Sequence, residues 1–267
     1  MKKIFRYTCM AVLAVGLASC STVPLSGRKQ LSLVSDDQIQ EQAASAYKEF
    51  LNASDTKVIT GTSQATKVKQ VGAKIATAVN SYLAAEGLAD QYNFNWEFNL
   101  IESGEVNAWC MPGGKVAVFT GILPFTANDA GLATVMGHEI AHAIARHSME
   151  QMSNQYALQV GAQVIGVASA GKSSVMQGLL NNAYGIGGQL ALLKYSRGNE
   201  SEADQLGLIF MAMAGYNPES AVSFWQRMAS AKAESSTPEF LSTHPSDVRR
   251  INDIQKLIPK AKQYYKK

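Results

Sequence analysis

The spacing of apolar residues predicts two helices near the beginning of the chain. Ser35-Asp36-Asp37-Gln38 has the form of a capping box and predicts a helix that runs to about Leu51. Between Ser63 and Ala85, apolar residues recur every three or four positions, which predicts a second and longer helix. The part of the chain before residue 90 is therefore expected to be mainly helical.

A different pattern follows and predicts a small sheet. From Asn95 to Ile101, apolar residues alternate with polar ones, as in a half-buried strand. Val106 to Trp109 and Lys115 to Thr120 predict two more strands around the turn Pro112-Gly113-Gly114. The remainder is mostly helical, so residues 36–267 are predicted to form a single α+β domain that is mostly helical.

Two long stretches without charge, Gln151 to Gly171 and Ser173 to Leu193, interrupt the second helical part. A membrane hairpin is one explanation. Buried helices of the domain, or a flap beside its functional site, are the other. Several glutamine, asparagine and serine side chains divide both stretches, so buried helices or a flap are favoured over a membrane hairpin.

The N-terminal residues have the three parts of a secretory signal: a positive start, a short apolar segment and small residues before a cleavage point. Leu17-Ala18-Ser19-Cys20 resembles a bacterial lipobox, which implies that residues 1–19 are removed and that Cys20 is acylated. The alternative is a plain secretory signal with a chance cysteine. Residues 20–35 have no period and are predicted to be an acylated tether. Ser21 resembles the outer-membrane sorting choice, which implies the periplasmic face of the bacterial outer membrane.

Composition and charge exclude several classes of protein. The chain has 267 residues, of which 46% are hydrophobic and 17% charged, which excludes a disordered chain and a collagen. The net charge of +3 comes from 24 basic and 21 acidic residues, and Lys2, Lys3 and Arg6 account for the whole excess. The mature chain is therefore neutral overall, and no nucleic-acid partner is predicted. The last segment, Arg249 to Lys267, has seven basic residues and one acidic residue, which suits either a solvated helix face or docking on anionic lipid headgroups.

Candidate chemistry is concentrated in His138-Glu139-Ile140-Ala141-His142, an HExxH sequence. On a helix, residues i and i+4 lie about 40° apart, so His138 and His142 can hold one Zn²⁺. Glu139 lies about 100° from His138, within reach of a water molecule on the metal. The alternative is a surface helix whose histidines have ordinary hydrogen-bond partners.

A catalytic zinc needs a third protein ligand. Residue 148 is serine, where metzincins have their third histidine. His147 is expected on the far side of the same helix, where it cannot ligate the metal and instead supports the ligands from outside or packs in the core. Glu200 and Asp204 share one helix face, so that Glu200 can bind zinc while Asp204 accepts a hydrogen bond from a ligand histidine. Glu202 faces away and is the poorer candidate, with a capping role as its alternative.

The fourth histidine, His244, precedes Pro245 in a predicted loop. It could stabilise the oxyanion of the reaction or occupy the open zinc position in a resting state. The alternative is a plain structural histidine.

These motifs, in this order, resemble the HtpX and CAAX prenyl endopeptidase type of zinc metallopeptidases, metallopeptidase family 48. The resemblance rests on Asn107-Ala108-Trp109, the Pro-Gly-Gly turn, HExxH, Ser-Arg-x-x-Glu-x-x-Ala-Asp from Ser196 and Thr243-His244-Pro245. It is greatest to the small lipoprotein members of the bacterial periplasm. It implies a zincin-like gluzincin fold, one zinc per chain on His138, His142 and Glu200, and Glu139 as the catalytic residue.

The function expected from these residues is that of a zinc endopeptidase. The strand from Asn107, including Ala108, is expected to pair with an extended substrate. Unfolded or misassembled envelope proteins are the expected substrates, which implies a role in protein quality control. The alternative is an envelope chaperone or assembly factor with a structural or normally closed zinc site; a metal-storage lipoprotein ranks last, because the sequence has one site. The oligomeric state is left open.

Overall fold

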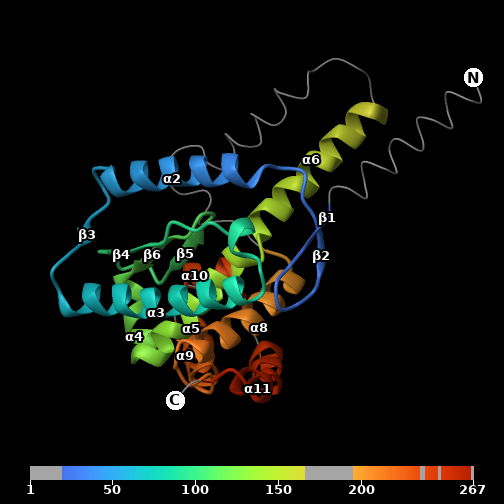
Figure 1. Ribbon diagram of the computed structural model, residues 1–267. Coiled ribbons are helices and arrows are strands. Elements are labelled where there is room, and N and C mark those ends of the chain that lie inside the picture. The colour runs from blue at the N-terminus through green and yellow to red at the C-terminus, as the bar shows by residue number, and fades with distance from the viewer. Residues whose placement is uncertain (1–19, 166–194, 235–237, 246–247, 266–267) are drawn as a thin grey trace, which may run out of the picture.

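The computed structural model describes residues 20–165, 195–234, 238–245 and 248–265 (Figure 1). The predicted signal peptide, residues 166–171 of the first uncharged stretch and the whole of the second uncharged stretch lie outside these residues. The elements in chain order are β1 (Cys20–Thr22), β2 (Lys29–Leu31), α2 (Asp36–Asn52), β3 (Val58–Ile59), α3 (Ser63–Ala85), β4 (Glu97–Ile101), β5 (Ala108–Met111), β6 (Lys115–Phe119), α4 (Leu123–Thr126), α5 (Asp129–Ile144), α6 (His147–Ile165), α8 (Arg197–Met213), α9 (Ser220–Glu234), α10 (Glu239–Thr243) and α11 (Val248–Lys262), with 3-10 turns at Ala89–Gln91 and Thr120–Ile122.

Four short strands form the main sheet in the order β3-β4-β6-β5. β4 and β6 are parallel, with Glu97 opposite Lys115, whereas β5 and β6 form an antiparallel hairpin. Gly113 and Gly114 in the hairpin turn have φ values of 80° and 85°, which glycine adopts without strain. Among the described strands, β5 has one neighbour and therefore forms an edge of the sheet.

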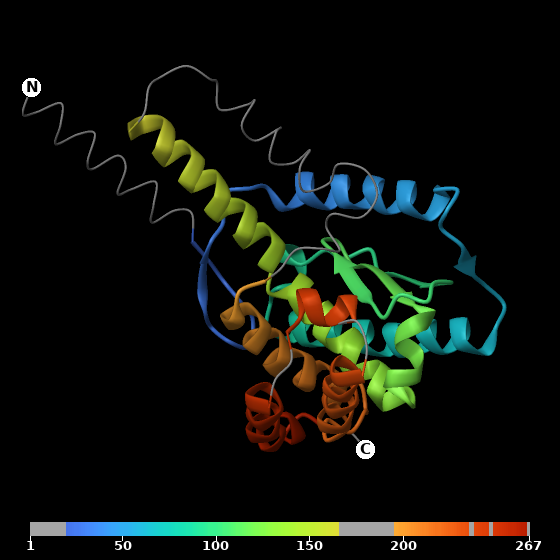
Figure 2. The same cartoon turned by 180° about the vertical axis from the view of Figure 1, so that it is seen from behind.

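Helices cover both faces of this sheet, with α2 on one side and α3 on the other (Figures 1 and 2). Ala117 and Phe119 of β6 pack with Tyr47 of α2, and the Tyr47 hydroxyl donates to the carbonyl of Val116 over 2.7 Å. Val116 and Val118 point the other way, into the larger core that includes α3 and α5. Because both faces are covered, every residue of β5 and β6 is buried.

Two glycines allow α5 and α8 to cross closely. A Cβ atom on Gly137 would lie 2.9 Å from the carbonyl oxygen of Gly207, and one on Gly207 would lie 2.8 Å from the backbone nitrogen of His138. Neither contact can be accommodated without movement of the backbone. The crossing sets the HExxH helix directly against the helix that begins Arg197-Gly198-Asn199-Glu200.

α5 and α6 do not form one continuous helix. α5 ends at Ile144, and Arg146 has a left-handed φ of 55° before α6 begins at His147. Arg146 is held there by Asp36, by the carbonyl of Gln91 and by the ring of Tyr92, 4.2 Å from its guanidinium carbon. The expectation that His147 continues the HExxH helix on its far side is therefore wrong.

The predicted tether, residues 20–35, contains regular structure. β1 and β2 pair in a two-stranded antiparallel sheet with Cys20 opposite Leu31, and Val23 between them is buried in the main core. Strands of three residues are too short to produce a visible alternation, which is why the sequence pattern did not predict them. The paired strands lie beside α6, which projects from the body of the molecule (Figures 1 and 2).

The predicted helices and strands are confirmed with small shifts at their ends, and so is the mostly helical α+β class. Within the described residues, no helix has both the length and the apolar character needed to cross a bilayer.

Candidate metal centre

Four buried side chains from three segments meet beside α5. His138 and His142 come from α5, Glu200 from the first turn of α8, and His244 from the residue that ends α10. One donor atom from each of the four lies within 4.8 Å of every other. The structure thus brings together the three residues predicted to ligate the metal and the histidine predicted to lie near it.

The spacing of these donor atoms suits a tetrahedral metal ion. Nε2 of His138 lies 3.1 Å from Nε2 of His142 and 3.2 Å from Nδ1 of His244. Oε1 of Glu200 lies 3.3 Å from Nε2 of His142 and 2.9 Å from Nδ1 of His244. Since Zn–N bonds are about 2.0–2.1 Å long, donors around a tetrahedral zinc lie about 3.3 Å apart. Imidazole with carboxylate is also a donor set that suits zinc.

Glu139 is buried next to this cluster and faces His244. Its Oε1 lies 3.4 Å from Nε2 of His244 and has no hydrogen-bond partner among the described residues. Burial raises the pKa of the Glu139 carboxyl, although positive charge on His244 and His138 acts against the rise. A carboxylate with a raised pKa and an unused oxygen is suited to accepting a proton.

The two histidines of α5 have opposite protonation tendencies. Burial acts to lower the pKa of His138, but hydrogen bonds and charge from Asp204 and Glu200 outweigh it and raise that pKa to about 9. Burial dominates at His142 and lowers its pKa well below the usual value, despite a hydrogen bond to Glu200. Without a metal, the pair therefore holds one proton near neutral pH, on His138.

Asp204 and Arg250 support the cluster from behind. Nδ1 of His138 lies 3.1 Å from Oδ1 of Asp204, the neighbour predicted for a ligand histidine. Arg250 donates to both oxygens of Asp204, over 2.8 and 2.9 Å, and its Nη1 lies 3.0 Å from Oε2 of Glu200. Its guanidinium carbon also lies 3.6 Å from the centre of the Trp225 ring. Arg250 was not predicted as a site residue, because in the sequence it stands within the basic C-terminal segment.

Aromatic rings enclose the histidines. Tyr195 stacks on His142 with 4.1 Å between ring centres, and Phe240 lies 4.7 Å from His244 in the same measure. Trp225 approaches His138 edge-on, at 6.0 Å. These apolar walls lower the local dielectric and so strengthen every charge interaction of the cluster.

His147 and Glu202 both lie in the surroundings of the cluster. His147 has the supporting position predicted for it, whereas Glu202 was predicted to face away. His147 is completely buried, and its Nδ1 lies 2.8 Å from Nδ1 of His142. Its Nε2 lies 2.9 Å from Oε2 of Glu202. Hydrogen bonds from His147, Ser26 and Arg28 overcome the effect of burial and lower the pKa of Glu202 to about 2. The capping bond in this turn comes instead from Ser196, whose hydroxyl accepts from the Asn199 N–H.

The predicted substrate strand lies next to the HExxH helix. Ala108 is the first residue of β5, and its edge from Ala108 to Met111 has no partner strand among the described residues. Asn107 is buried and bonds to Glu105 and to the Ala108 N–H. Cys20, the predicted acylation site, lies apart from the cluster, exposed in β1.

Comparisons with known proteins agree with this geometry. Residues 63–258 match peptidase family M48. The mitochondrial metalloendopeptidase OMA1 of Schizosaccharomyces pombe is 34% identical over 240 residues, which cover 90% of this chain and 66% of the relative. OMA1 of Saccharomyces cerevisiae is 37% identical over 64% of this chain and 49% of its own length. The beta-barrel assembly-enhancing protease of Yersinia pestis is 30% identical over 60% of this chain and 34% of its own length.

This chain thus spans from about a third to about two thirds of the length of these curated relatives. The matched region contains α3, the main sheet strands from β4 onward, α5, α8 and the four clustered donors. The zincin-like fold expected from the sequence is confirmed, and the chain belongs to peptidase family M48.

Proposed function

We propose that the chain is a zinc-dependent endopeptidase with one zinc per chain, bound by His138, His142 and Glu200. The observation that carries the proposal is the convergence of these three donors beside Glu139, a buried carboxylate with an unused oxygen. A carboxylate with a proton-accepting role next to a His₂Glu donor set suits hydrolysis of a peptide bond.

A bound zinc would polarise the carbonyl of the substrate and lower the pKa of a bound water molecule. Glu139 removes the proton of the attacking water and later transfers it to the leaving amine. The edge of β5 pairs with the extended substrate backbone and so places the scissile bond along α5. Asp204 fixes the orientation of the His138 ring, and Arg250 holds Asp204 and Glu200 in place.

His244 gives the site two proposed states. Its Nδ1 lies among the donor atoms, so in the resting protein it acts as a fourth donor and closes the site. A substrate carbonyl needs an open position, so His244 has to leave the donor set before catalysis. Its Nε2 lies 3.4 Å from Oε1 of Glu139, so a small displacement of the ring would leave it near the reacting atoms, where it could donate to the developing oxyanion.

The closed arrangement also favours a second candidate, an envelope chaperone or assembly factor with a normally closed zinc site. Structural zinc sites have four protein donors, and four are gathered here. The buried and intact Glu139 favours the peptidase, because a structural zinc has no use for an unpartnered carboxylate oxygen.

We further propose that the chain acts on unfolded or misassembled proteins at the periplasmic face of the bacterial outer membrane, anchored by a lipid on Cys20. The lipobox-like Leu-Ala-Ser-Cys supports this location, as does the similarity to a bacterial protease named for beta-barrel assembly. The OMA1 relatives are named as mitochondrial metalloendopeptidases, so they support the enzymatic activity and not this location.

Casein cleavage by the purified protein, with and without a chelator, tests the enzyme, and Glu139→Gln serves as the inactive reference. We expect cleavage that zinc restores after chelation. His244→Ala compares the two roles of that side chain, because loss of the closing donor speeds cleavage whereas loss of the oxyanion contact slows it. Zinc binding without any cleavage by either protein favours the chaperone. Proteomics of cleaved envelope proteins, in cells that have the wild type or Glu139→Gln, tests the substrates. Mass spectrometry of the N-terminal peptide tests the lipid anchor on Cys20.

A further inference from the structure

A continuous series of contacts leads from His142 to the hairpin β1–β2. Nδ1 of His142 lies 2.8 Å from Nδ1 of His147, and Nε2 of His147 lies 2.9 Å from Oε2 of Glu202. Glu202 then accepts from Nε of Arg28 over 2.7 Å and from the hydroxyl of Ser26 over 2.5 Å. Ser26 and Arg28 both lie in the connection between β1 and β2, more than 110 residues before His142 in sequence.

The chemistry of this series assigns each proton. Nε2 of His142 faces the other donor atoms, so a metal there leaves the ring proton on Nδ1. That N–H can only donate to Nδ1 of His147, which fixes the proton of His147 on Nε2 and makes it donate to Glu202. Glu202 is the acceptor at the end, and Arg28 and Ser26 fill its remaining lone pairs. Every contact has one donor and one acceptor.

We propose that His147 and Glu202 are positioning residues for His142, and that Ser26 and Arg28 make the zinc affinity of the site depend on the docked N-terminal hairpin. The proposal rests on metal binding by His142. Groups that hold the outer N–H of a ligand histidine orient its ring and raise its basicity. A hairpin that docks on this acceptor therefore acts on the metal without touching it.

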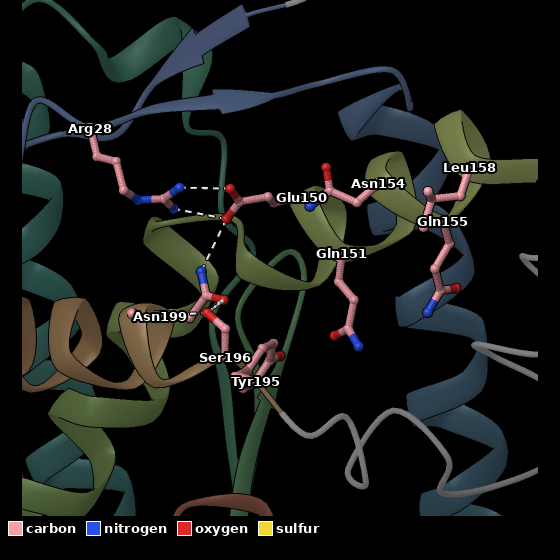
Figure 3. Close-up of a pocket in the computed structure, with 10 residues that line it drawn as sticks. Arg28, Glu150, Gln151, Asn154, Gln155, Leu158, Tyr195, Ser196 and Asn199 are labelled. Carbon is pink, nitrogen blue, oxygen red and sulfur yellow. Dashed lines mark hydrogen bonds and ion pairs between the residues drawn. The ribbon is translucent and has the colours of Figure 1, made fainter. Parts of the chain in front are cut away.

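Glu150 provides a matched control. Figure 3 shows it between Arg28 and Asn199, and it accepts from Nη1 and Nη2 of Arg28 over 2.6 and 2.8 Å. Arg28→Gln and Glu150→Gln both break this ion pair, and each removes one charge, positive in the first variant and negative in the second. Only Arg28→Gln also removes a donor from Glu202.

The experiment measures zinc affinity of the full chain by competition with a chromophoric chelator, and the absorption spectrum of the Co²⁺-loaded protein. We expect His147→Phe to weaken zinc binding about 10- to 100-fold, with partial recovery in His147→Gln, whose amide oxygen can still accept from His142. Arg28→Gln should weaken binding several-fold and change the Co²⁺ spectrum, whereas Glu150→Gln should do neither.

The outcomes separate this proposal from the proposed function. Equal zinc affinities for Arg28→Gln and Glu150→Gln, in a protein whose zinc binding His142→Ala abolishes, overturn the positioning role alone. Failure of the wild-type protein to bind zinc overturns the metal site and this inference together. If His147→Phe does not fold, Arg28→Gln and Glu150→Gln still test the positioning role. Both substitutions lie at the partly exposed end of the series, where the fold tolerates them.

Discussion

At the scale of single residues, Arg250 is the cation on which the buried acidic groups depend. It contacts Glu200 and Asp204, and all three side chains are at least nine-tenths buried. Removing one partner of a buried charge cluster leaves the others uncompensated, at a cost of about 3–5 kcal/mol. We therefore expect Arg250→Gln to lower the free energy of unfolding of the metal-free protein by about that amount. Urea unfolding measures it, with Lys260→Gln at an exposed position of the same helix as the control. Equal midpoints for the two variants would contradict the role given to Arg250.

Substitution of Glu139 tests proton transfer separately from metal binding. Oε1 of Glu139 has no hydrogen-bond partner among the described residues, and Glu139 does not belong to the donor set, so Glu139→Gln keeps the shape of the site and the metal. We expect a full zinc content and a loss of kcat of at least about 10²-fold, the usual contribution of a general base. Elemental analysis and a peptide cleavage assay on the same sample measure both; substantial residual cleavage argues against this mechanism.

The proton held on His138 gives zinc binding a pH dependence. The pKa of His138 is raised to about 9 in the metal-free protein, whereas His142 is already neutral. A ligand histidine has to lose its proton, so zinc binding at pH 7 should release about one proton, and the apparent affinity should rise with pH until about pH 9. Calorimetry in two buffers of different ionisation enthalpy detects the release. Binding heats that do not depend on the buffer would refute it.

At the scale of elements, the crossing of α5 and α8 determines where Glu200 meets the two histidines. Gly207→Ala would place a methyl group 2.8 Å from the backbone of His138 and should push the helices apart. We expect a loss of about 1–3 kcal/mol in the free energy of unfolding, together with weaker zinc binding. Gly198→Ala, on the same helix, meets nothing closer than 3.7 Å and should change neither quantity for the worse. Similar losses in both variants would mean that the crossing is not the cause.

Local periodicity was sufficient to predict the parts of the site that share one helix. The i, i+4 pairs His138–His142 and Glu200–Asp204 lie as the spacing requires, because each pair depends on the geometry of a single helix. The helix α3 was predicted to its end residues for the same reason. Motif order then predicted that the two helices come together, through resemblance to a family.

Contacts between elements could not be predicted in this way. The pairing of His147 with Glu202 depends on the break at Arg146 and on how α6 and α8 meet, which no helical period reveals. The basic segment that contains Arg250 has the composition of a solvated helix face. Arg250 is buried because α11 packs on α8. The parallel neighbours β4 and β6 are likewise separated in sequence by β5.

At the scale of the whole molecule, a metal bound by donors from α5, α8 and the end of α10 links three segments of the chain. A ligand that binds only the folded state adds about 2.7 kcal/mol of stability when its concentration is 100 times Kd. For a chain of this size, that corresponds to about 5–10 °C in Tm. We expect removal of zinc by a chelator to lower Tm by this amount, as measured by differential scanning calorimetry. His138→Ala should unfold at one temperature with or without chelator, and a chelator effect on that variant would mean that the metal acts elsewhere.

Because the donors come from three segments of the chain, the metal site can form only late in folding. Two histidines on α5 alone are a weak metal site, and Glu200 and His244 follow His142 by 58 and 102 residues. Contacts of such large sequence separation form late in folding, because loop closure has to occur first. A chain that has not finished folding therefore lacks the complete donor set. Completion of the metal site thus depends on the folding of the whole domain, with no need for a separate inhibitory segment.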